Sequence, residues 1–382
     1  MLGLYIHIPF CEKKCHYCNF VITRASGPGA AKEQRFLSLF EKEILCRAPG
    51  VARRRFDTLY FGGGTPSALG EKELARVFSL IFKNFNFKKN IEITLEANPG
   101  DVTPAKARFL KRQGVNRVSL GAQSFHDKTL AMLNRAHRAR DIFSSFDALR
   151  GAGFGNINLD LMLSLPGETP AGLSHSLEEL KRLNPEHVSL YELVIEEKTV
   201  FARRFQKGTL DLPGEEASLA MLSGARAFLE RHGWHAYELL NHAKRGFESA
   251  HNRLYWKNEE YLGLGPGAYS YIKGKRHRHS VSFDQYLSKC SAGDWSHAEE
   301  EILGPREREA ESFLLVLRTA EGVERRRHAA HLSRVQKTME GFLESGLVER
   351  ADTRLRFTER GKLFAESVFA GLSLPDSPIL PD

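Results

Sequence analysis

Short apolar runs of strand type alternate with longer segments of helical periodicity from residue 2 to about residue 240. Because neighbouring parallel strands must be joined by a crossover helix, this alternation predicts an α/β fold with a parallel sheet. Six strand-helix units are expected, with strands at 4–8, 58–61, 91–97, 117–120, 157–163 and 187–193, and helices near 32–47, 71–84, 104–113, 139–152, 172–182 and 215–231. Periodicity does not decide between an open sheet and a barrel, but both place ligands at the carboxyl ends of the strands.

The pattern changes after about residue 240, where the sequence becomes rich in aromatic residues and glycine. Beyond about residue 280 it is mainly helical, with helices predicted over 307–318 and 332–345 and a hairpin formed by 347–350 and 355–358. Helices followed by a hairpin suggest a small, winged-helix-like C-terminal domain. We therefore predict a core at 1–240, a segment at 241–280 that closes the core, and a C-terminal domain at 281–382.

Composition narrows the class of protein only in part. Lys+Arg 55 against Asp+Glu 47 gives a net charge of +8, spread along the chain, which permits an anionic ligand, a nucleic acid or an acidic membrane surface. Five cysteines are too few for a disulfide-stapled secreted domain. No apolar run of signal-peptide length precedes Cys11, and no segment has the roughly 20 apolar residues that span a bilayer. We expect a cytoplasmic protein without a transmembrane segment, in a compartment where clustered thiols hold metal more often than they form disulfides.

Three of the five cysteines, Cys11, Cys15 and Cys18, form a C-x3-C-x2-C cluster in the predicted loop after the first strand. Three thiolates suit a [4Fe-4S] cluster that leaves one iron open to a small-molecule ligand, whereas electron-transfer clusters use four. A zinc site usually has four ligands, so zinc would need His7 or His16 to complete it. An incidental group of buried cysteines is the remaining alternative.

Glycine or polar residues stand at the carboxyl ends of the later strands. The run Gly62-Gly63-Gly64-Thr65-Pro66 follows the second strand, where missing Cβ atoms let the backbone approach a polar ligand. Asp160 lies between Leu159 and Leu161, and a carboxylate in such a strand is costly to bury unless an arginine or lysine pairs with it. Further polar candidates at or beyond strand ends are Glu96, Gln123 and Arg135.

The cysteine spacing, with Tyr17 before the third cysteine, resembles that of the radical SAM family. In that family the open iron of a [4Fe-4S] cluster binds the amino and carboxylate groups of S-adenosylmethionine. The resemblance implies a partial (β/α)6 barrel, with Cys11, Cys15 and Cys18 as the metal ligands. In the coproporphyrinogen-dehydrogenase branch, Arg135 would suit a carboxylate and Glu96 a cation. The cofactor-binding residues that the resemblance implies, besides the cysteines, are Tyr5, Tyr17, Gly63, Gly64, Thr65, Glu96, Gln123, Arg135 and Asp160.

Two departures separate the sequence from coproporphyrinogen III dehydrogenase itself. That enzyme has a fourth cysteine two residues after the third, where this chain has Phe20, and it has an extension before the first strand. The segment from His251 to Trp256 instead resembles the H-N-x-x-Y-W motif of the HemW-type haem chaperones. This resemblance implies haem as cargo and haem-accepting apoproteins as partners, such as respiratory enzymes at the membrane surface.

Several alternatives stay open in the sequence. His251 either ligates haem iron, with Tyr255 and Trp256 against the porphyrin, or forms a hydrogen-bonded corner that closes the barrel. The basic run at 276–279 either meets haem propionates or is a solvated loop. One alternative function is oxidative decarboxylation of coproporphyrinogen III by a 5′-deoxyadenosyl radical. Another is binding or modification of tRNA, but no aromatic platform accompanies the basic run at 325–328, so we expect no nucleic-acid partner.

Overall fold

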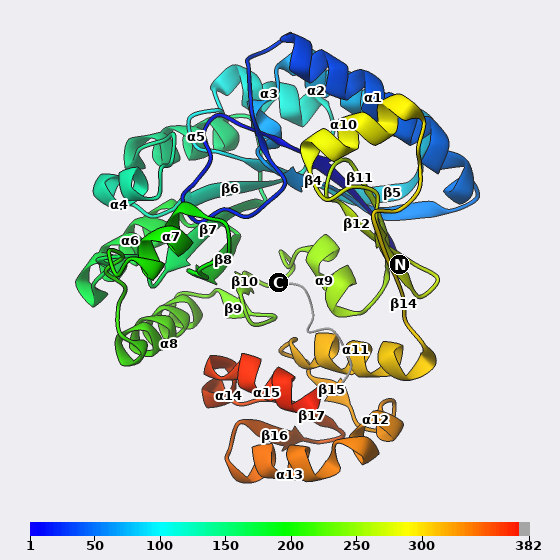
Figure 1. The fold of residues 1–382 in the computed structure, drawn as a ribbon. Coiled ribbons are helices and arrows are strands. Elements are labelled where there is room, and N and C mark those ends of the chain that lie inside the picture. The colour runs from blue at the N-terminus through cyan, green and yellow to red at the C-terminus, as the bar shows by residue number, and fades with distance from the viewer. Residues whose placement is uncertain (374–382) are drawn as a thin grey trace.

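The computed structural model describes residues 1–373, and parallel strands in chain order form its centre (Figure 1). The strands are β1 (Leu2–Ile8), β4 (Arg55–Gly63), β5 (Asn86–Ala97), β6 (Arg117–Gln123), β7 (Ile157–Leu163) and β8 (His187–Glu192). The helices that follow them are α1 (Ala31–Arg47), α2 (Glu71–Asn84), α3 (Pro104–Arg112), α5 (Ala139–Gly151), α6 (Pro170–Leu183) and α8 (Glu215–Arg231). The predicted α/β class and its strand-helix units are confirmed.

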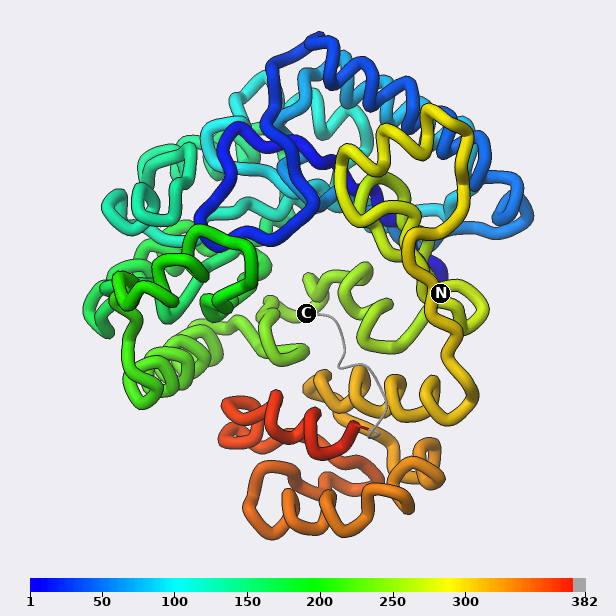
Figure 2. The backbone as a smooth tube through the Cα atoms, viewed as in Figure 1, coloured from blue at the N-terminus to red at the C-terminus, as the bar shows by residue number. Residues whose placement is uncertain are grey.

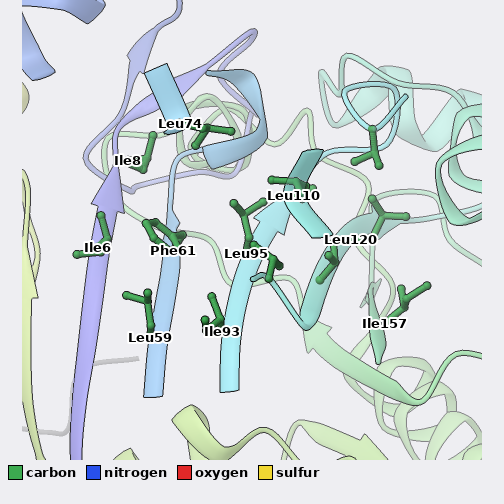
Figure 3. Packing of buried hydrophobic residues seen from close by; sticks show 14 of the residues in the cluster. Ile6, Ile8, Leu59, Phe61, Leu74, Ile93, Leu95, Leu110, Leu120 and Ile157 are labelled. Atoms are coloured by element: carbon green, nitrogen blue, oxygen red, sulfur yellow. The ribbon is translucent and has the colours of Figure 1, made fainter. Parts of the chain in front are cut away.

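The central strands have one apolar face and one polar face. Successive side chains of a strand point to opposite sides, so the buried Ile6, Leu59 and Leu95 share the face that packs against the helices (Figure 3). The alternate positions on the other face, which we call the inner face, carry Tyr60 and Glu96. Open parallel sheets covered on both sides are apolar on both faces. A polar inner face is instead suited to binding a polar ligand.

Additional short strands widen this sheet to twelve strands, in the order β14-β13-β12-β11-β1-β4-β5-β6-β7-β8-β10-β9. Beside β1 lie the parallel β11 (Glu260–Leu264) and then the antiparallel β12 (Tyr269–Ile272), β13 (Lys275–Arg278) and β14 (Glu299–Ile302). At the other edge, β10 (Asn241–Ala243) and β9 (His235–Ala236) are antiparallel. The sequence analysis predicted none of these strands.

The basic run at 276–279 is neither a solvated loop nor a free cationic surface. Residues 275–278 form β13, which pairs with the acidic β14. Arg276 forms ion pairs with Glu301 (3.1 Å) and with Glu311, and Arg278 pairs with Glu299. These ion pairs give no support to the alternative that the run meets haem propionates, because its arginines already have carboxylate partners.

The remaining short elements connect these strands and helices. They are β2 (Phe10–Cys11), β3 (Thr23–Arg24), the 3-10 helices η1 (Ala48–Val51) and η2 (Pro66–Ala68), α4 (Asp127–Met132), α7 (Val200–Gln206), α9 (Ala250–Trp256) and α10 (Phe283–Ala292). Helix α10 packs against α1, and its Phe283, Tyr286 and Cys290 belong to the core of the large sheet. Residues 283–302 thus lie with the large sheet, although the sequence division placed them in the C-terminal domain.

A second, mainly helical unit follows α10 and β14 in the chain (Figure 2). It has its own core, which includes Phe313, Leu355 and Phe369, and a sheet in the order β15-β17-β16. Its elements are α11 (Pro305–Leu317), β15 (Val323–Glu324), α12 (Ala329–Arg334), α13 (Gln336–Glu344), β16 (Val348–Ala351), β17 (Arg354–Phe357), α14 (Glu359–Leu363) and α15 (Ala365–Leu372). The predicted hairpin is present, whereas the helix predicted over 332–345 is two helices, α12 and α13. The domain boundaries stay a prediction, whose last stretch, 374–382, lies outside the described residues.

Within residues 1–373, none of the helices combines the length and the apolar character that crossing a membrane requires.

Candidate functional site

The cysteine cluster occupies the loop that follows β1, at the carboxyl-end edge of the sheet. Backbone hydrogen bonds fix this loop from two sides. The amide of His16 donates to the carbonyl of Leu133 (3.1 Å), and the amide of Phe201, in α7, donates to the carbonyl of His16 (3.0 Å). Tyr17 is half-buried beside the same α7 region. Three partly exposed thiols share the loop: Cys11, Cys15 and Cys18.

A chain of polar contacts links two of these thiols across the carboxyl ends of three strands. The Cys11 Sγ lies 3.4 Å from the Oγ1 of Thr65, to which the Nδ2 of Asn98 donates (3.2 Å). Arg135 completes the chain, because its Nη2 donates to the Oδ1 of Asn98 (2.5 Å) and its Nη1 approaches the Sγ of Cys15 (3.5 Å). Asn98 was missed in the sequence analysis, although it follows β5 immediately after Glu96-Ala97. This arrangement brings Thr65 and Arg135 to the cluster loop, and their role in binding a cofactor stays a prediction.

Burial disfavours the ionised form of two of the thiols, Cys11 and Cys18. Burial raises the pKa of Cys11 to about 11, although the Thr65 hydrogen bond and the Arg135 charge act in the opposite direction. Burial also raises the pKa of Cys18. Because the thiolate is the form that ligates a metal, assembly of a metal centre here would release protons.

Two glycines allow close approaches at this edge of the sheet. Gly63 has φ of 104°, and a Cβ at this position would lie 2.5 Å from the Nδ1 of His7. A Cβ at Gly121 would lie 3.0 Å from the Nη2 of Arg135 and 3.2 Å from the Nε2 of Gln123. Gln123 itself ends β6 with a left-handed backbone, φ of 64°. Gly63 therefore leaves room for the His7 ring, and Gly121 leaves room for the side chains of Arg135 and Gln123.

The backbone amide of Gly64 is hydrogen-bonded within the protein and is therefore not free to donate to a ligand. Its amide donates to the carbonyl of Ile8 (2.8 Å), which holds the glycine run against the end of β1. A Cβ at Gly64 would lie 2.8 Å from the carbonyl oxygen of Phe10. Only glycine allows this close approach of the two strand ends.

Glu96 lies among aromatic rings on the inner face. Its Oε1 accepts a hydrogen bond from the hydroxyl of Tyr60 (2.7 Å), and the Tyr60 ring stacks on those of Tyr5 and His251, with centroids 6.0 and 5.0 Å away. Burial, assisted by the nearby Asp160 carboxylate, raises the pKa of Glu96 to about 7. A cation bound here would favour the ionised form of Glu96.

Replacing Glu96 with glutamine should change how stability depends on pH. Because the folded state raises the pKa of Glu96 from 4.5 to about 7, it binds more protons than the unfolded state between these values, and its stability falls as the pH rises. Glu96→Gln removes this penalty. In urea unfolding of the cofactor-free protein, the free energy of unfolding of Glu96→Gln relative to wild type should increase from about pH 5 to about pH 8.

Burial also raises the pKa of Glu43 to about 7. Because Glu43 is present in both wild type and Glu96→Gln, its contribution cancels in the difference between their free energies of unfolding. A difference between variant and wild type that does not change with pH would contradict the assignment of the raised pKa to Glu96.

Asp160 also lies on the inner face, with neutral donors around it in the described residues. Its Oδ1 accepts a hydrogen bond from the Nδ2 of Asn158 (2.7 Å), and the Ser119 hydroxyl lies 3.4 Å from both carboxylate oxygens. Burial raises the pKa of Asp160, and the charges of Arg117 and Arg135 partly offset this effect. The alternative of a direct pairing with arginine or lysine is thus not what the hydrogen bonds show.

The histidines that a zinc site would need have other partners. The Nε2 of His7 lies 2.8 Å from the carbonyl oxygen of Val21, and the Nδ1 of His16 lies 2.9 Å from that of Met132. In residues 1–373, no three His, Cys, Asp or Glu side chains are placed to hold a single metal ion. In this structure His7 and His16 therefore do not join the cysteines in a preformed site for a single ion.

His251 is buried in α9, and both of its ring nitrogens have partners. Its Nδ1 lies 2.7 Å from the Oγ1 of Thr58 and its Nε2 lies 2.9 Å from the hydroxyl of Tyr255. The amide of His251 donates to Glu92 of β5 (3.0 Å), which ties α9 to the sheet. Trp256 is covered by the guanidinium of Arg318, 4.4 Å from the ring centroid. The geometry therefore favours the hydrogen-bonded corner over the haem ligand for His251.

Comparisons with known proteins identify the family of this chain. The model of the Radical SAM superfamily matches residues 5–180. The heme chaperone HemW of Bacillus subtilis is 36% identical over 375 residues, which cover 97% of this chain and 98% of the relative. HemW of Lactococcus lactis is 32% identical over 377 residues, covering 97% of each protein.

The solved structure of coproporphyrinogen III oxidase (HemN) from Escherichia coli, a radical SAM enzyme, has the same fold. It superposes with a TM-score of 0.86 over 97% of this chain and 90% of HemN, at 24% identity. Similarity over nearly the full length of two HemW proteins decides the family more sharply than the fold does. The chain belongs to the radical SAM superfamily and, within it, to the HemW family.

Proposed function

We propose that the protein is a haem chaperone that holds a [4Fe-4S] cluster and S-adenosylmethionine, binds haem and delivers it to apoproteins such as respiratory enzymes. The observation that carries this proposal is the similarity over nearly the whole chain to proteins named heme chaperone HemW. A similarity restricted to the radical SAM core would support the [4Fe-4S] cluster and S-adenosylmethionine as cofactors, but it would not support haem as the cargo.

The residues at the carboxyl-end edge fit both cofactors. Three partly exposed thiols in one loop can hold three irons of a cluster, and the Arg135 guanidinium beside the Cys15 Sγ lowers the cost of negative charge there. When bound, the cluster supplies one open iron for the amino and carboxylate groups of S-adenosylmethionine and an electron for its reduction. In this proposal Arg135 pairs with a carboxylate of the ligand, and Glu96 accepts a cation on the inner face. The contacts of Arg135 with Cys15 and of Glu96 with Tyr60 support these roles.

Phe20 favours the chaperone over a coproporphyrinogen III dehydrogenase. It occupies the position of the dehydrogenase's fourth cysteine, and its side chain is 63% exposed. We expect no protoporphyrinogen when the reconstituted protein is incubated anaerobically with coproporphyrinogen III, S-adenosylmethionine and dithionite. Formation of protoporphyrinogen at a catalytic rate would overturn the chaperone proposal and establish the enzyme.

The proposal includes haem and its acceptor proteins as partners and a cytoplasmic location, with delivery at the membrane surface. It includes no nucleic-acid partner. Because both ring nitrogens of His251 are hydrogen-bonded, the proposal does not use His251 as the ligand of haem iron. The H-N-x-x-Y-W segment instead closes the inner face of the sheet.

A further inference from the structure

Polar side chains form a row across four parallel strands of the inner face. The strand register places Glu96 of β5 beside Ser119 of β6, Ser119 beside Asn158 of β7, and Asn158 beside His187 of β8. Asn158 and His187 are 1% and 0% exposed. Asp160 follows two positions after Asn158 on the same face of β7 and is partly exposed. The row thus leads from a buried histidine to an accessible carboxylate.

Short hydrogen bonds connect this histidine to Asp160. The hydroxyl of Tyr237 lies 2.9 Å from the Nε2 of His187, and the Nδ1 of His187 lies 2.6 Å from the Oδ1 of Asn158. The Nδ2 of Asn158 lies 2.7 Å from the Oδ1 of Asp160 and 2.6 Å from the Oγ of Ser119. We call Tyr237, His187 and Asn158 the His187 chain.

The chemistry of Asp160 sets the direction of every bond in the His187 chain. An ionised carboxylate only accepts hydrogen bonds, so the amide nitrogen of Asn158 must face Asp160 and the amide oxygen must face His187. The Nδ1 of His187 must then carry the proton, and its Nε2 is left to accept from the hydroxyl of Tyr237. The buried imidazole stays neutral, because burial and the Arg117 charge hold its pKa well below the usual value. One tautomer of His187 therefore fits its surroundings.

We propose that the His187 chain is a positioning network, which turns the Asn158 amide toward Asp160 and so directs the free lone pairs of the Asp160 carboxylate at a hydroxyl-bearing ligand on the inner face. The inference rests on the proposed function and takes Asp160 as a residue that contacts S-adenosylmethionine, as the family resemblance implies. The ribose of that cofactor carries such hydroxyls. His187, Asn158 and Tyr237 act through Asp160 and need no contact with the ligand.

The burial of the His187 chain indicates a specific role for its polar side chains. Apolar side chains would fill the same positions without the cost of desolvating polar groups. The outward neighbours Val188 and Leu190 already supply β8 with its apolar packing against the core. Asn158 of the His187 chain gives Asp160 its shortest described hydrogen bond, at 2.7 Å, whereas the Ser119 hydroxyl is 3.4 Å away. The Oδ1 of Asn158 has two donors, the Nδ1 of His187 at 2.6 Å and the Ser189 hydroxyl at 3.2 Å. Removing the shorter of these hydrogen bonds would weaken the hold on the Asn158 amide that faces its nitrogen toward Asp160.

Two substitutions of His187 test whether the N–H at the Nδ1 position matters independently of the rest of the imidazole ring. Asparagine can place an amide N–H where the Nδ1 of His187 lies, whereas the amide of glutamine reaches the position of the Nε2. We expect His187→Gln to weaken binding of S-adenosylmethionine to the cluster-loaded protein about tenfold, as loss of an oriented buried hydrogen bond does. His187→Asn should stay within about twofold of wild type. Anaerobic equilibrium dialysis with S-adenosylmethionine measures both, with iron content and thermal unfolding checked in each variant.

A double-mutant cycle with Asp160→Asn distinguishes positioning from general stability. We expect Asp160→Asn to weaken binding, and His187→Gln to cause no further loss in the Asp160→Asn background. Equal losses from His187→Gln in both backgrounds, or equal effects of His187→Gln and His187→Asn, would overturn the positioning role while leaving the Asp160 contact intact. Unchanged affinity of Asp160→Asn alone would refute the proposed contact with Asp160 and with it the positioning role.

Discussion

Replacing Cys15 with alanine is expected to remove nearly all iron and sulfide from the reconstituted protein. Three thiolates in one loop leave no spare ligand, and Cys15 is the thiol that the Arg135 guanidinium approaches at 3.5 Å. A site-differentiated [4Fe-4S] cluster that loses one of three protein ligands has two left, which do not hold it against buffer thiols. Iron and sulfide analysis and the visible absorbance of the protein after anaerobic reconstitution measure this effect.

Cys46→Ala is the matched control, because Cys46 is exposed on α1 and lies outside the cluster loop. This variant should bind as much iron as wild type. If Cys15→Ala retained the cluster, the ligand set Cys11, Cys15 and Cys18 would be wrong.

Replacing Gly63 with alanine is expected to lower the free energy of unfolding by about 3 kcal/mol, which combines backbone strain with a steric clash. Gly63 has φ of 104°, which an L side chain rarely adopts, and the new Cβ would meet the His7 ring at 2.5 Å. His7 is buried and its Nε2 lies 2.8 Å from the Val21 carbonyl oxygen, so the ring cannot move without disturbing the segment after the cluster loop. Urea unfolding measures the change.

Gly224→Ala provides the comparison for the same chemical change. Gly224 lies within α8, where a Cβ meets no other atom within 4 Å. Alanine there should raise the free energy of unfolding by about 0.5–1 kcal/mol, because glycine costs a helix backbone entropy. A loss of less than about 1 kcal/mol in Gly63→Ala would show that the glycine run tolerates a side chain and is not constrained as the structure indicates.

The sequence is most informative where local pattern and tertiary structure agree. The central strands and the helices after them are long and periodic, so their bounds follow the predictions closely, as for α2 (Glu71–Asn84) and β7 (Ile157–Leu163). The position of Thr65 and Arg135 at the cluster loop also follows, because parallel strands bring their carboxyl ends to one edge.

Other features depend on pairing between distant segments and have no local signal. Strand β13 is Lys-Arg-His-Arg and β14 is Glu-Glu-Glu-Ile, neither of which alternates apolar and polar residues. Their pairing depends on charge complementarity, which becomes visible only when Arg276 and Glu301 are seen together. Likewise the motif at His251 has the residue types of a haem site, and only Thr58, 193 positions away, shows that its Nδ1 is occupied.

A haem titration tests the central claim most directly. The cluster-loaded protein is titrated anaerobically with haem, the Soret band is followed, and an apo-haemoprotein is then added to the complex. The account predicts saturable, stoichiometric binding and transfer of the bound haem to the acceptor faster than haem transfers from buffer. Absence of stoichiometric binding, or a complex that does not release haem to any acceptor, would contradict the proposal that this protein is a haem chaperone.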